Sequence, residues 1–545
     1  MSDLLLTPEG VRDIVPSEFK RKLEIEDKLL GVIKDSGFLH MQTPSFEYFD
    51  VFSNDIGTTP SSMLYKFYDK EGNTLVLRPD FTPAMARAFS KLYFNENGPV
   101  KLCYCGSTFV NGTELNGDLK ESTQIGAELY NDDSCEADAA MISLVVKCMK
   151  AVGFKDFLVS IGNGNFFRGL CEQLGIEERD EHELRRLISA RNYFRAKEKL
   201  AALNVNEEYT SLIVNISDTY TTKDSLIELR KRIDNPMCTD ALTRLVGIVD
   251  LLDKEGFGKY ISIDLGLLNK YEYYTGVLFR AYTFGFGDAI MKGGRYDNLV
   301  MQFGKEAPAI GFGIAVDDLL EALTSLEQAG KTGKNEYLTF ALTKGRLADK
   351  TLALLEKTGI TCEEMKDKET RKLIFVNEEL KLRFFLAKGP DVPTYVEHGV
   401  ADIGVVGKDT IDEEMRKIYE VLDLKFGKCR MCVCGPENAK ALLSTRDMIK
   451  IATKYPRIAK KYFNDVKHQS VDIIKLNGSI ELAPIVGLSD CIVDIVETGS
   501  TLRENGLSVL EEIYDLSARM VVNPVSMRLH SARINGLIGK LKEEL

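Results

Sequence analysis

A short polar segment bracketed by two glycines divides this chain into two stretches, each long enough to form its own core. Leucines at helical spacing precede Gly330, and a strand pattern starts at Tyr337, after Gly333. A chain of 545 residues exceeds what one hydrophobic core supports. We therefore predict a front domain over residues 1–327, a linker over 328–335 and a second domain over 336–545.

Both stretches alternate apolar, strand-like runs with helical patterns, which favours an α+β domain in front and an α/β domain behind. The net charge of −12 argues against broad binding to nucleic acid, which needs clustered Lys and Arg. No apolar run is long enough to span a bilayer, and the first residues, MSDLLLTPEGVRDIVPSEF, lack the pattern of a signal peptide. We expect a cytoplasmic protein that binds neither nucleic acid nor membranes.

The eleven cysteines show no metal-binding arrangement. Cys103 and Cys105, like Cys432 and Cys434, alternate as residues on strands do. Cys429 and Cys432 form one C-x-x-C, but neither a second pair nor a His lies at zinc spacing. We predict reduced, mostly buried cysteines and no metal site made by protein side chains.

Residues 490–507, DCIVDIVETGSTLRENGL, carry the most chemical information. The run CIVDIV is typical of a buried parallel strand, and a small polar loop separates it from a helix start. Backbone N–H groups and hydroxyls of such a loop can surround a phosphate. Asp494 and Glu497 would repel the phosphate but can accept hydrogen bonds from ribose hydroxyls, so a ribose 5-phosphate fits both features. Alternatively, the loop only caps the helix through Ser500 or Thr501.

The second stretch resembles the short-form catalytic subunit of ATP phosphoribosyltransferase. The resemblance rests on five segments in order, namely LTFALTKGRLADKTLALLEKTGI, DVPTYVEHGVADIGVVGKD, KFGKCRMCVCGP, IATKYPRIAKKYF and KLNGSIELAPIVGLSDCIVDIVETGSTL. It implies a two-lobed α/β fold like that of periplasmic binding proteins, with the reaction cleft between the lobes. It also implies the first step of histidine biosynthesis, in which ATP is joined to phosphoribosyl pyrophosphate.

The residue types suit this reaction. Adenine N1 of ATP attacks C1 of the ribose while pyrophosphate leaves, and preorganised cations stabilise the negative charge that grows on the leaving group. We expect Lys344 and Arg346 to contact the pyrophosphate, with Gly345 allowing close approach of the backbone, and Glu497 to act at the ribose. Mg²⁺ would bridge the pyrophosphate oxygens.

Further substrate contacts are assigned with less chemical detail. For the ribose phosphate we predict Asp494, Thr498, Gly499, Ser500 and Thr501. Candidates for the ATP side, each of which could equally be a solvated surface residue, are Arg371, Arg430, Lys454 and Tyr455. Lys388 stands where the family often has Arg, and Lys cannot form a bidentate contact with a phosphate.

The first stretch resembles the catalytic domain of histidyl-tRNA synthetase, a class II aminoacyl-tRNA synthetase fold. TPEGVRDIVP, LRPDFTPAMAR, STQIGAELY, YEYYTG, GGRYDNL and AIGFGIAVDDL carry the resemblance. Residues that the family uses for ATP are absent, because Val110, Asp118, Asn269 and Asp318 replace arginines and Gly112 replaces a Glu. An Asp in place of a phosphate-binding cation repels the phosphate. We therefore predict that aminoacyl transfer has been lost.

The amino-acid pocket of that family, by contrast, is largely kept. Acids and Gln suit a ligand with an ammonium and an imidazole, and Tyr adds stacking and a hydroxyl. The residues carried over by the resemblance are Asp80, Thr82, Gln124, Glu128, Glu272, Tyr273, Tyr274 and Arg295. Alternatively, they only hold the sheet together.

This combination is similar to the regulatory subunit that accompanies short-form ATP phosphoribosyltransferases. The resemblance implies feedback inhibition by histidine through the front domain, and a homo-oligomer. Two rival functions remain, a working histidyl-tRNA ligase and a non-catalytic small-molecule sensor. The lost arginines oppose the first, and the intact KGR and ETGST segments oppose the second.

Overall fold

The computed structural model describes residues 5–53, 59–112, 119–219, 221–268, 274–332, 337–365, 372–445 and 448–545. It separates into two compact units, Met1–Lys334 and Asn335–Leu545. The division falls inside the segment predicted as a linker, but helix α12 (Val316–Thr332) continues through residues 328–332, which are therefore not linker. A single Gly in a helix costs only about 1 kcal/mol, so Gly330 does not end it. None of the helices in the described ranges is long and apolar enough to span a membrane.

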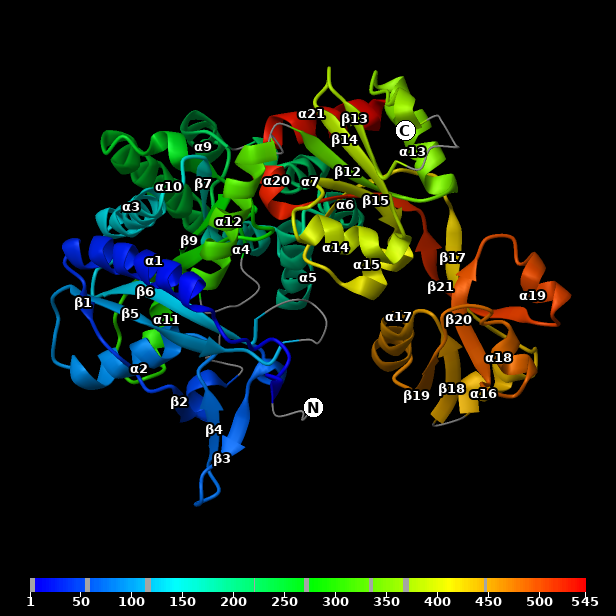
Figure 1. Ribbon diagram of the computed structural model, residues 1–545, viewed down its shortest axis with the longest axis horizontal. Coiled ribbons are helices and arrows are strands. Elements are labelled where there is room, and N and C mark those ends of the chain that lie inside the picture. Colours follow the sequence, from blue (N-terminus) through cyan, green and yellow to red (C-terminus); the bar gives the residue numbers. More distant parts are fainter. Residues whose placement is uncertain are drawn as a thin grey trace. The chain divides into compact units, whose positions relative to one another are not determined.

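An eight-stranded, mainly antiparallel sheet is the centre of the first unit (Figure 1). Helices α1 (Pro16–Asp35), α3 (Cys135–Val152), α10 (Pro236–Lys254) and α12 pack against this sheet. In order across the sheet, the strands are β1 (Leu39–His40), β5 (Val100–Phe109), β6 (Glu121–Tyr130), β11 (Ala309–Ala315), β10 (Met291–Arg295), β9 (Val277–Thr283), β7 (Phe157–Asn163) and β8 (Ile261–Ile263).

The helices of this unit follow the spacing of their apolar residues. In α1, buried Ile25, Leu29 and Ile33 recur every four residues and so lie on one face. The helices are α1 (Pro16–Asp35), α2 (Thr82–Leu92), α3 (Cys135–Val152), α4 (Gly164–Gln173), α5 (Glu178–Ser189), α6 (Tyr193–Ala202), α7 (Glu207–Val214), α8 (Ile216–Thr219), α9 (Lys223–Arg230), α10 (Pro236–Lys254), α11 (Asp297–Met301) and α12.

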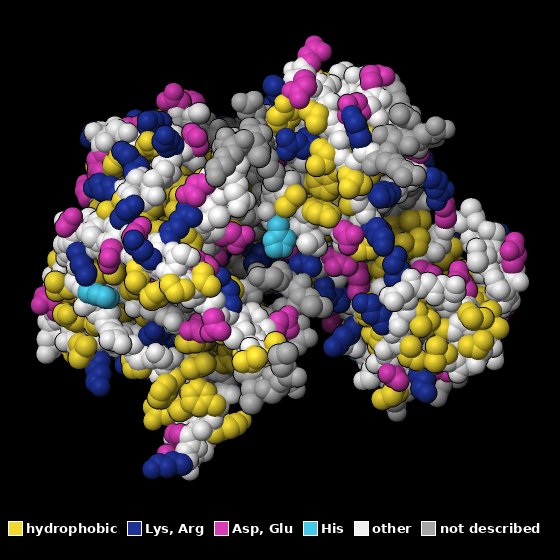
Figure 2. Space-filling model, in the orientation of Figure 1, with side chains coloured by type: hydrophobic (Ala, Val, Ile, Leu, Met, Phe, Trp, Pro, Cys, Tyr) yellow, Lys and Arg dark blue, Asp and Glu magenta, His cyan; other side chains and the backbone are white. Residues whose placement is uncertain are grey.

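A small antiparallel sheet of β2 (Phe46–Tyr48), β4 (Thr74–Leu77) and β3 (Lys66–Tyr68) packs against the main body of the unit. Its inner face carries Val76, which is fully buried, and Glu47, which pairs with Arg87 of α2 at 2.6 Å. Its outer face exposes Phe46 and Tyr48. Figure 2 shows hydrophobic side chains gathered over this small sheet.

The second unit consists of two α/β lobes. The first lobe has the sheet order β13 (Ile374–Asn377), β14 (Leu382–Ala387), β12 (Leu338–Thr343), β15 (Ile403–Gly407), β22 (Ala518–Val522) and β16 (Tyr419–Asp423). The second has β19 (Ser470–Lys475), β18 (Met448–Thr453), β20 (Cys491–Val496), β17 (Cys429–Gly435) and β21 (Ser508–Leu516). The helices are α13 (Arg346–Lys357), α14 (Val392–Glu397), α15 (Lys408–Glu414), α16 (Ala439–Thr445), α17 (Pro456–Lys461), α18 (Leu482–Ile485), α19 (Ser500–Glu504), α20 (Pro524–Leu529) and α21 (Ser531–Glu543).

The chain crosses between the lobes twice, at residues 424–428 and at Ser517. The two crossings lie side by side, because the N–H of Ala518 donates to the carbonyl of Phe426 at 2.9 Å and the Ser517 hydroxyl donates to Asp423 at 2.8 Å. Two short, adjacent crossings are a hinge arrangement, around which the lobes can open and close.

Most of the cysteines are buried, as predicted. All eleven are free, and every one except Cys105, Cys135 and Cys429 is buried. Among the residues that the structure describes, no group of three or more His, Cys, Asp or Glu side chains could hold a metal ion. Burial raises the pKa of most of these thiols, for example that of Cys103 to about 11, so they stay protonated at neutral pH.

Candidate functional site

The turn that follows β12 in the first lobe faces the second lobe through Arg346, and we call the space between the two lobes the cleft. This strand ends at Thr343, and α13 begins at Arg346, so Lys344 and Gly345 form the connection. Gly345 has φ +91° and ψ −148°, a conformation that residues with a side chain rarely adopt. The N–H of Lys344 donates to the carbonyl of Ala387 at 2.9 Å, which fixes the turn against β14.

The facing wall is the loop after β20, in the second lobe. The strand ends at Val496, and Gly499 has φ +71° just before α19. The hydroxyls of Thr498 and Ser500 lie 3.0 Å apart, and the Ser500 N–H donates to Thr498 Oγ1 at 3.4 Å. Both side chains are exposed, so hydroxyl and N–H groups are available to the oxygens of a phosphate.

The two walls meet in an ion pair between Arg346 and Glu497. Arg346 Nη2 lies 3.0 Å from Glu497 Oε2, and Nη1 lies 3.5 Å from Oε1. The hydrogen bond that Arg346 donates to Glu497 raises the pKa of Arg346. The side chains are 82% and 55% exposed, so the pair adds little stability, and a charged ligand can replace either partner at small cost.

Asp494 and Tyr455 are less exposed than the Arg346–Glu497 pair. Burial raises the pKa of Asp494 to about 6, with a smaller contribution from Glu481, so the carboxylate is mostly ionised at neutral pH. The Tyr455 hydroxyl is hydrogen-bonded to Asp409 of the first lobe, and burial together with this contact raises the pKa of Tyr455. Tyr455 is only 6% exposed and therefore joins the lobes rather than presenting an open face to ATP.

The other candidates for the ATP side are distributed differently. Lys454 is exposed, 5.7 Å from the Tyr455 ring, and its charge opposes the rise in the pKa of Asp494, which places it close to the cleft. Arg430 is ion-paired with Glu512 of β21. Arg371 lies outside the described residues.

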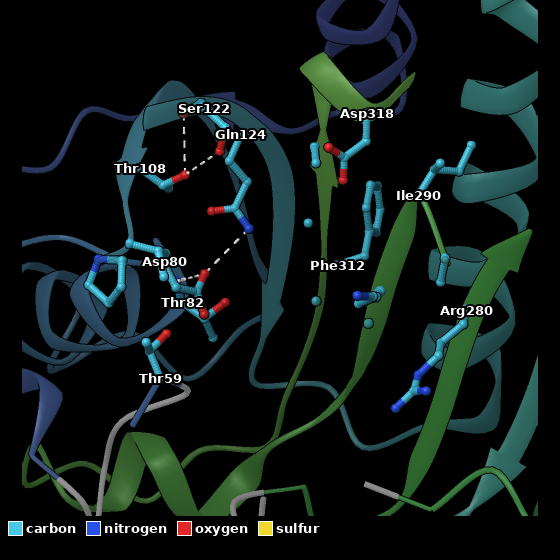
Figure 3. Close-up of a pocket in the computed structure, with 18 of the residues that line it drawn as sticks. Thr59, Asp80, Thr82, Thr108, Ser122, Gln124, Arg280, Ile290, Phe312 and Asp318 are labelled. Carbon is cyan, nitrogen blue, oxygen red and sulfur yellow. Dashed lines mark hydrogen bonds between the residues drawn. The ribbon is translucent and has the colours of Figure 1, made fainter. Parts of the chain in front are cut away.

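The first unit contains a cavity of about 430 Å³ on the sheet (Figure 3). Alternation along β6 directs Ile125 and Ala127 into the core and Gln124 to the cavity side. Asp80 accepts hydrogen bonds from Gln124 Nε2 at 3.4 Å and from the Thr82 N–H at 3.3 Å. One carboxylate and two polar side chains thus form one end of the cavity, an arrangement that suits an ammonium group.

Glu128 lies beneath this cavity and is fully buried. It accepts hydrogen bonds from Thr82 Oγ1 at 3.0 Å and from the Tyr296 hydroxyl at 2.5 Å. Burial raises its pKa to about 8, and Asp80 adds to the rise. A Cβ at Gly311 would lie 1.5 Å from Glu128 Oε2, so only Gly leaves room for this carboxyl on the neighbouring strand.

We expect Glu128→Gln to change how the stability of the first unit depends on pH. Because the folded-state pKa is raised, folded Glu128 holds a proton that the unfolded chain loses above about pH 4.5, and the stability falls as pH rises to about 8. The glutamine variant should avoid a loss of roughly 3–4 kcal/mol between pH 5 and pH 8. Melting curves across this range would show a widening gap in Tm between variant and wild type; a constant gap would contradict the assignment.

The synthetase resemblance also places ATP in this cavity. Val110 and Asp318 both line it. Burial raises the pKa of Asp318 to about 7, and nearby Lys292, which pairs with Asp288 at 2.9 Å, opposes the rise. Figure 3 shows Asp318 beside Phe312, with Arg280 on β9. Val110 and Asp318 thus contribute an apolar side chain and a carboxylate to the cavity, where the resemblance implies arginines.

Comparisons with known proteins find a matching family for each of the two units. The family model for histidyl-tRNA synthetase matches residues 10–319, and that for ATP phosphoribosyltransferase matches residues 388–543. The ATP phosphoribosyltransferase of Lachnoclostridium phytofermentans is 70% identical over 210 residues, 38% of this chain and 98% of that protein. The ATP phosphoribosyltransferase regulatory subunit of Acetivibrio thermocellus is 33% identical over 360 residues, 66% of this chain and 86% of that protein.

A crystal structure from Bacillus halodurans C, of an ATP phosphoribosyltransferase regulatory subunit/histidyl-tRNA synthetase, has a TM-score of 0.56 and 26% identity. The match covers 71% of this chain and 100% of that one. This chain belongs to the ATP phosphoribosyltransferase family. The catalytic and regulatory relatives are separate proteins, whereas this member of the family contains both parts.

The family assignment confirms the expected fold classes, a class II synthetase-like domain followed by an ATP phosphoribosyltransferase domain. Two of the predicted pocket residues do not line the cavity, since Glu128 lies beneath it and Arg295 is placed elsewhere. Arg295 does not line the cavity, because its buried guanidinium pairs with Asp138 at 2.6 Å and donates to the carbonyl of Asp132. The Arg of GGRYDNL therefore holds α3 to the sheet.

Tyr274 lines the cavity as predicted, whereas Glu272, Tyr273, Asn269 and Asp118 lie outside the described residues. Two residues were missed at the sequence level. Tyr296, which follows Arg295 in GGRYDNL, holds Glu128, and Asp409, the last residue of VVGKD, contacts Tyr455. Tyr296 directly follows β10, and Asp409 lies two residues after the end of β15, so a polar residue just past a strand is the signal that marks them.

Proposed function

We propose that the cleft of the second unit joins ATP to phosphoribosyl pyrophosphate, and that histidine bound in the first unit inhibits this reaction. The observation that carries the proposal is the meeting of Arg346 and Glu497, which places a cation and a carboxylate between two chain turns suited to oxygen-rich groups. The family of the chain supports the same reaction.

The reaction forms a bond from adenine N1 to ribose C1 and breaks the bond from C1 to the pyrophosphate oxygen. In the structure, Arg346 is paired with Glu497 at 3.0 Å. A pyrophosphate would displace the carboxylate from the guanidinium and free Glu497 for the ribose hydroxyls. Lys344 adds charge on the same turn, and donors that face the developing charge lower the barrier.

Mg²⁺ would enter with the pyrophosphate and neutralise part of its charge. The described residues offer no set of three carboxylate, His or Cys ligands. We therefore expect pyrophosphate oxygens and water to supply most ligands, as is usual for Mg²⁺ bound with phosphates.

For the first unit, we propose that Asp80 and Gln124 hold the ammonium of histidine. Their polar groups line the cavity, while Val110 and Asp318, which also line it, disfavour a nucleotide there. Because the regulatory relative is named as a subunit, we also propose that this chain assembles as a homo-oligomer. Formation of phosphoribosyl-ATP by the purified chain, measured over a histidine titration, tests both parts of the proposal.

The unmodified chain should show no histidine-dependent exchange of pyrophosphate into ATP. The physical reason is the loss of cations at Val110 and Asp318, where the charge of the triphosphate would develop. Substituting Arg at 110, 269 and 318 together is expected to restore weak exchange at most. Exchange by the wild-type chain, measured with labelled pyrophosphate beside a histidyl-tRNA synthetase as positive control, would show that the first unit still activates histidine.

A further inference from the structure

The two lobes of the second unit touch through a second set of contacts, away from Arg346 and Glu497. Helix α15 of the first lobe contacts α17 of the second. The carboxylate of Glu413 accepts hydrogen bonds from the N–H groups of Arg457, at 3.1 and 3.2 Å, and of Ile458, at 3.1 Å. These charge-assisted hydrogen bonds therefore fix the orientation of the Glu413 carboxylate relative to the start of α17.

Arg457 makes the reciprocal contact, from its side chain to the backbone of α15. Arg457 Nη1 donates to the carbonyls of Glu413 and Glu414, each at 2.9 Å. These carbonyls belong to the last turn of α15, whose backbone acceptors have no partner within the helix. Each side chain thus satisfies backbone groups at the end of the opposite helix, so the two ends are held in one relative position.

This reciprocal contact is close in sequence to polar residues of the cleft. Asp409 lies one turn before Glu413 on α15, and Tyr455 lies two residues before Arg457. The hydrogen bond from Tyr455 to Asp409 crosses between the lobes beside it. Both helices follow the carboxyl ends of strands, β15 and β18, which face the cleft. Any change in the approach of α15 to α17 therefore changes the width of the cleft.

We propose that Glu413 and Arg457 form a latch that holds the lobes at the separation required for phosphoribosyl transfer. Both are positioning residues, since neither contacts the reacting atoms. The inference rests on the proposed reaction in this cleft and adds the device that sets its geometry. The hinge allows the lobes to open. Contacts that form only between closed lobes therefore set the fraction of molecules whose cleft can bind substrate.

The test uses full-length chains carrying Glu413→Ala, Glu413→Gln, Arg457→Ala and the double alanine variant. Loss of the latch lowers the closed fraction, so the KM for phosphoribosyl pyrophosphate should rise about 10-fold while kcat changes less than about 3-fold. Glu413→Gln keeps an oxygen acceptor and should recover most of the affinity. The double variant should be worse than either single one, since Glu413→Ala removes the bonds to the N–H groups of Arg457 and Ile458, whereas Arg457→Ala removes those to the carbonyls of α15.

The matched control is Glu414→Ala, which changes the neighbouring side chain but keeps the carbonyl that Arg457 contacts. It should behave as wild type. An unchanged KM in Glu413→Ala would overturn the latch, as would equal losses in Glu413→Ala and Glu413→Gln accompanied by a lower Tm, which indicate a packing role. Calorimetric titration with phosphoribosyl pyrophosphate alone separates the two proposals. If the wild type binds and the alanine variants bind more weakly, the latch is supported even when no phosphoribosyl-ATP forms. If no phosphoribosyl-ATP forms with the wild type, the proposed reaction is overturned.

Discussion

Replacing Glu497 with Ala is expected to lower kcat/KM for phosphoribosyl pyrophosphate about 30- to 1000-fold, the usual effect of losing one transition-state contact of 2–4 kcal/mol. The carboxylate is 55% exposed and contributes little to packing, so the fold should be unaffected. Arg346→Ala should cause a loss of similar size, because the guanidinium would no longer neutralise the departing pyrophosphate. Arg346→Lys should recover part of the activity, since Lys keeps the charge but not the two-pronged geometry.

Steady-state kinetics on purified chains with equal Tm values would measure these effects. Glu504→Gln is the matched control, because Glu504 is an exposed carboxylate at the end of α19, on the same loop and helix. Its kinetics should equal those of the wild type. Near-normal kcat/KM in both Glu497→Ala and Arg346→Ala would place the substrate elsewhere in the second unit.

Replacing Gln124 with Ala is expected to raise the histidine concentration for half-inhibition about 10- to 100-fold, as expected for losing one hydrogen bond to a charged group. Gln124 lines the cavity and bonds Asp80, so its removal weakens recognition of the ammonium directly and through its neighbour. Turnover without histidine should stay within about 2-fold of wild type, because linkage alters only the ligand-dependent part of the equilibrium.

Reciprocity gives an independent measurement. If histidine favours the inhibited state, phosphoribosyl pyrophosphate must weaken histidine binding by the same factor, which calorimetry on the wild-type chain can determine. Gln173→Ala, an exposed Gln at the end of α4, is the control and should leave inhibition unchanged. Unchanged inhibition in Gln124→Ala would place the sensor elsewhere, and a parallel loss of basal turnover would show that the residue supports the fold.

Several features could be predicted because they depend on local physics. Apolar spacing and glycine positions determined the two units, and the pattern of strand, small polar loop and helix start located the Glu497 loop. The replacement of arginines by Val110 and Asp318 could also be predicted, since a change of charge is visible in the sequence without a structure. In the structure, Val110 and Asp318 do line the cavity.

The sequence alone determined which residue types each unit has for its chemistry; only the tertiary structure decided which of them meet. Arg346 and Glu497 are 151 residues apart, and no local pattern links them. Arg295 was placed in the pocket by its motif, but long-range folding brings Asp138 to it, and a buried guanidinium needs such a partner. The Glu413–Arg457 contact arises in the same way, because hydrogen bonds between helix ends depend on how two lobes approach, which chain spacing does not specify.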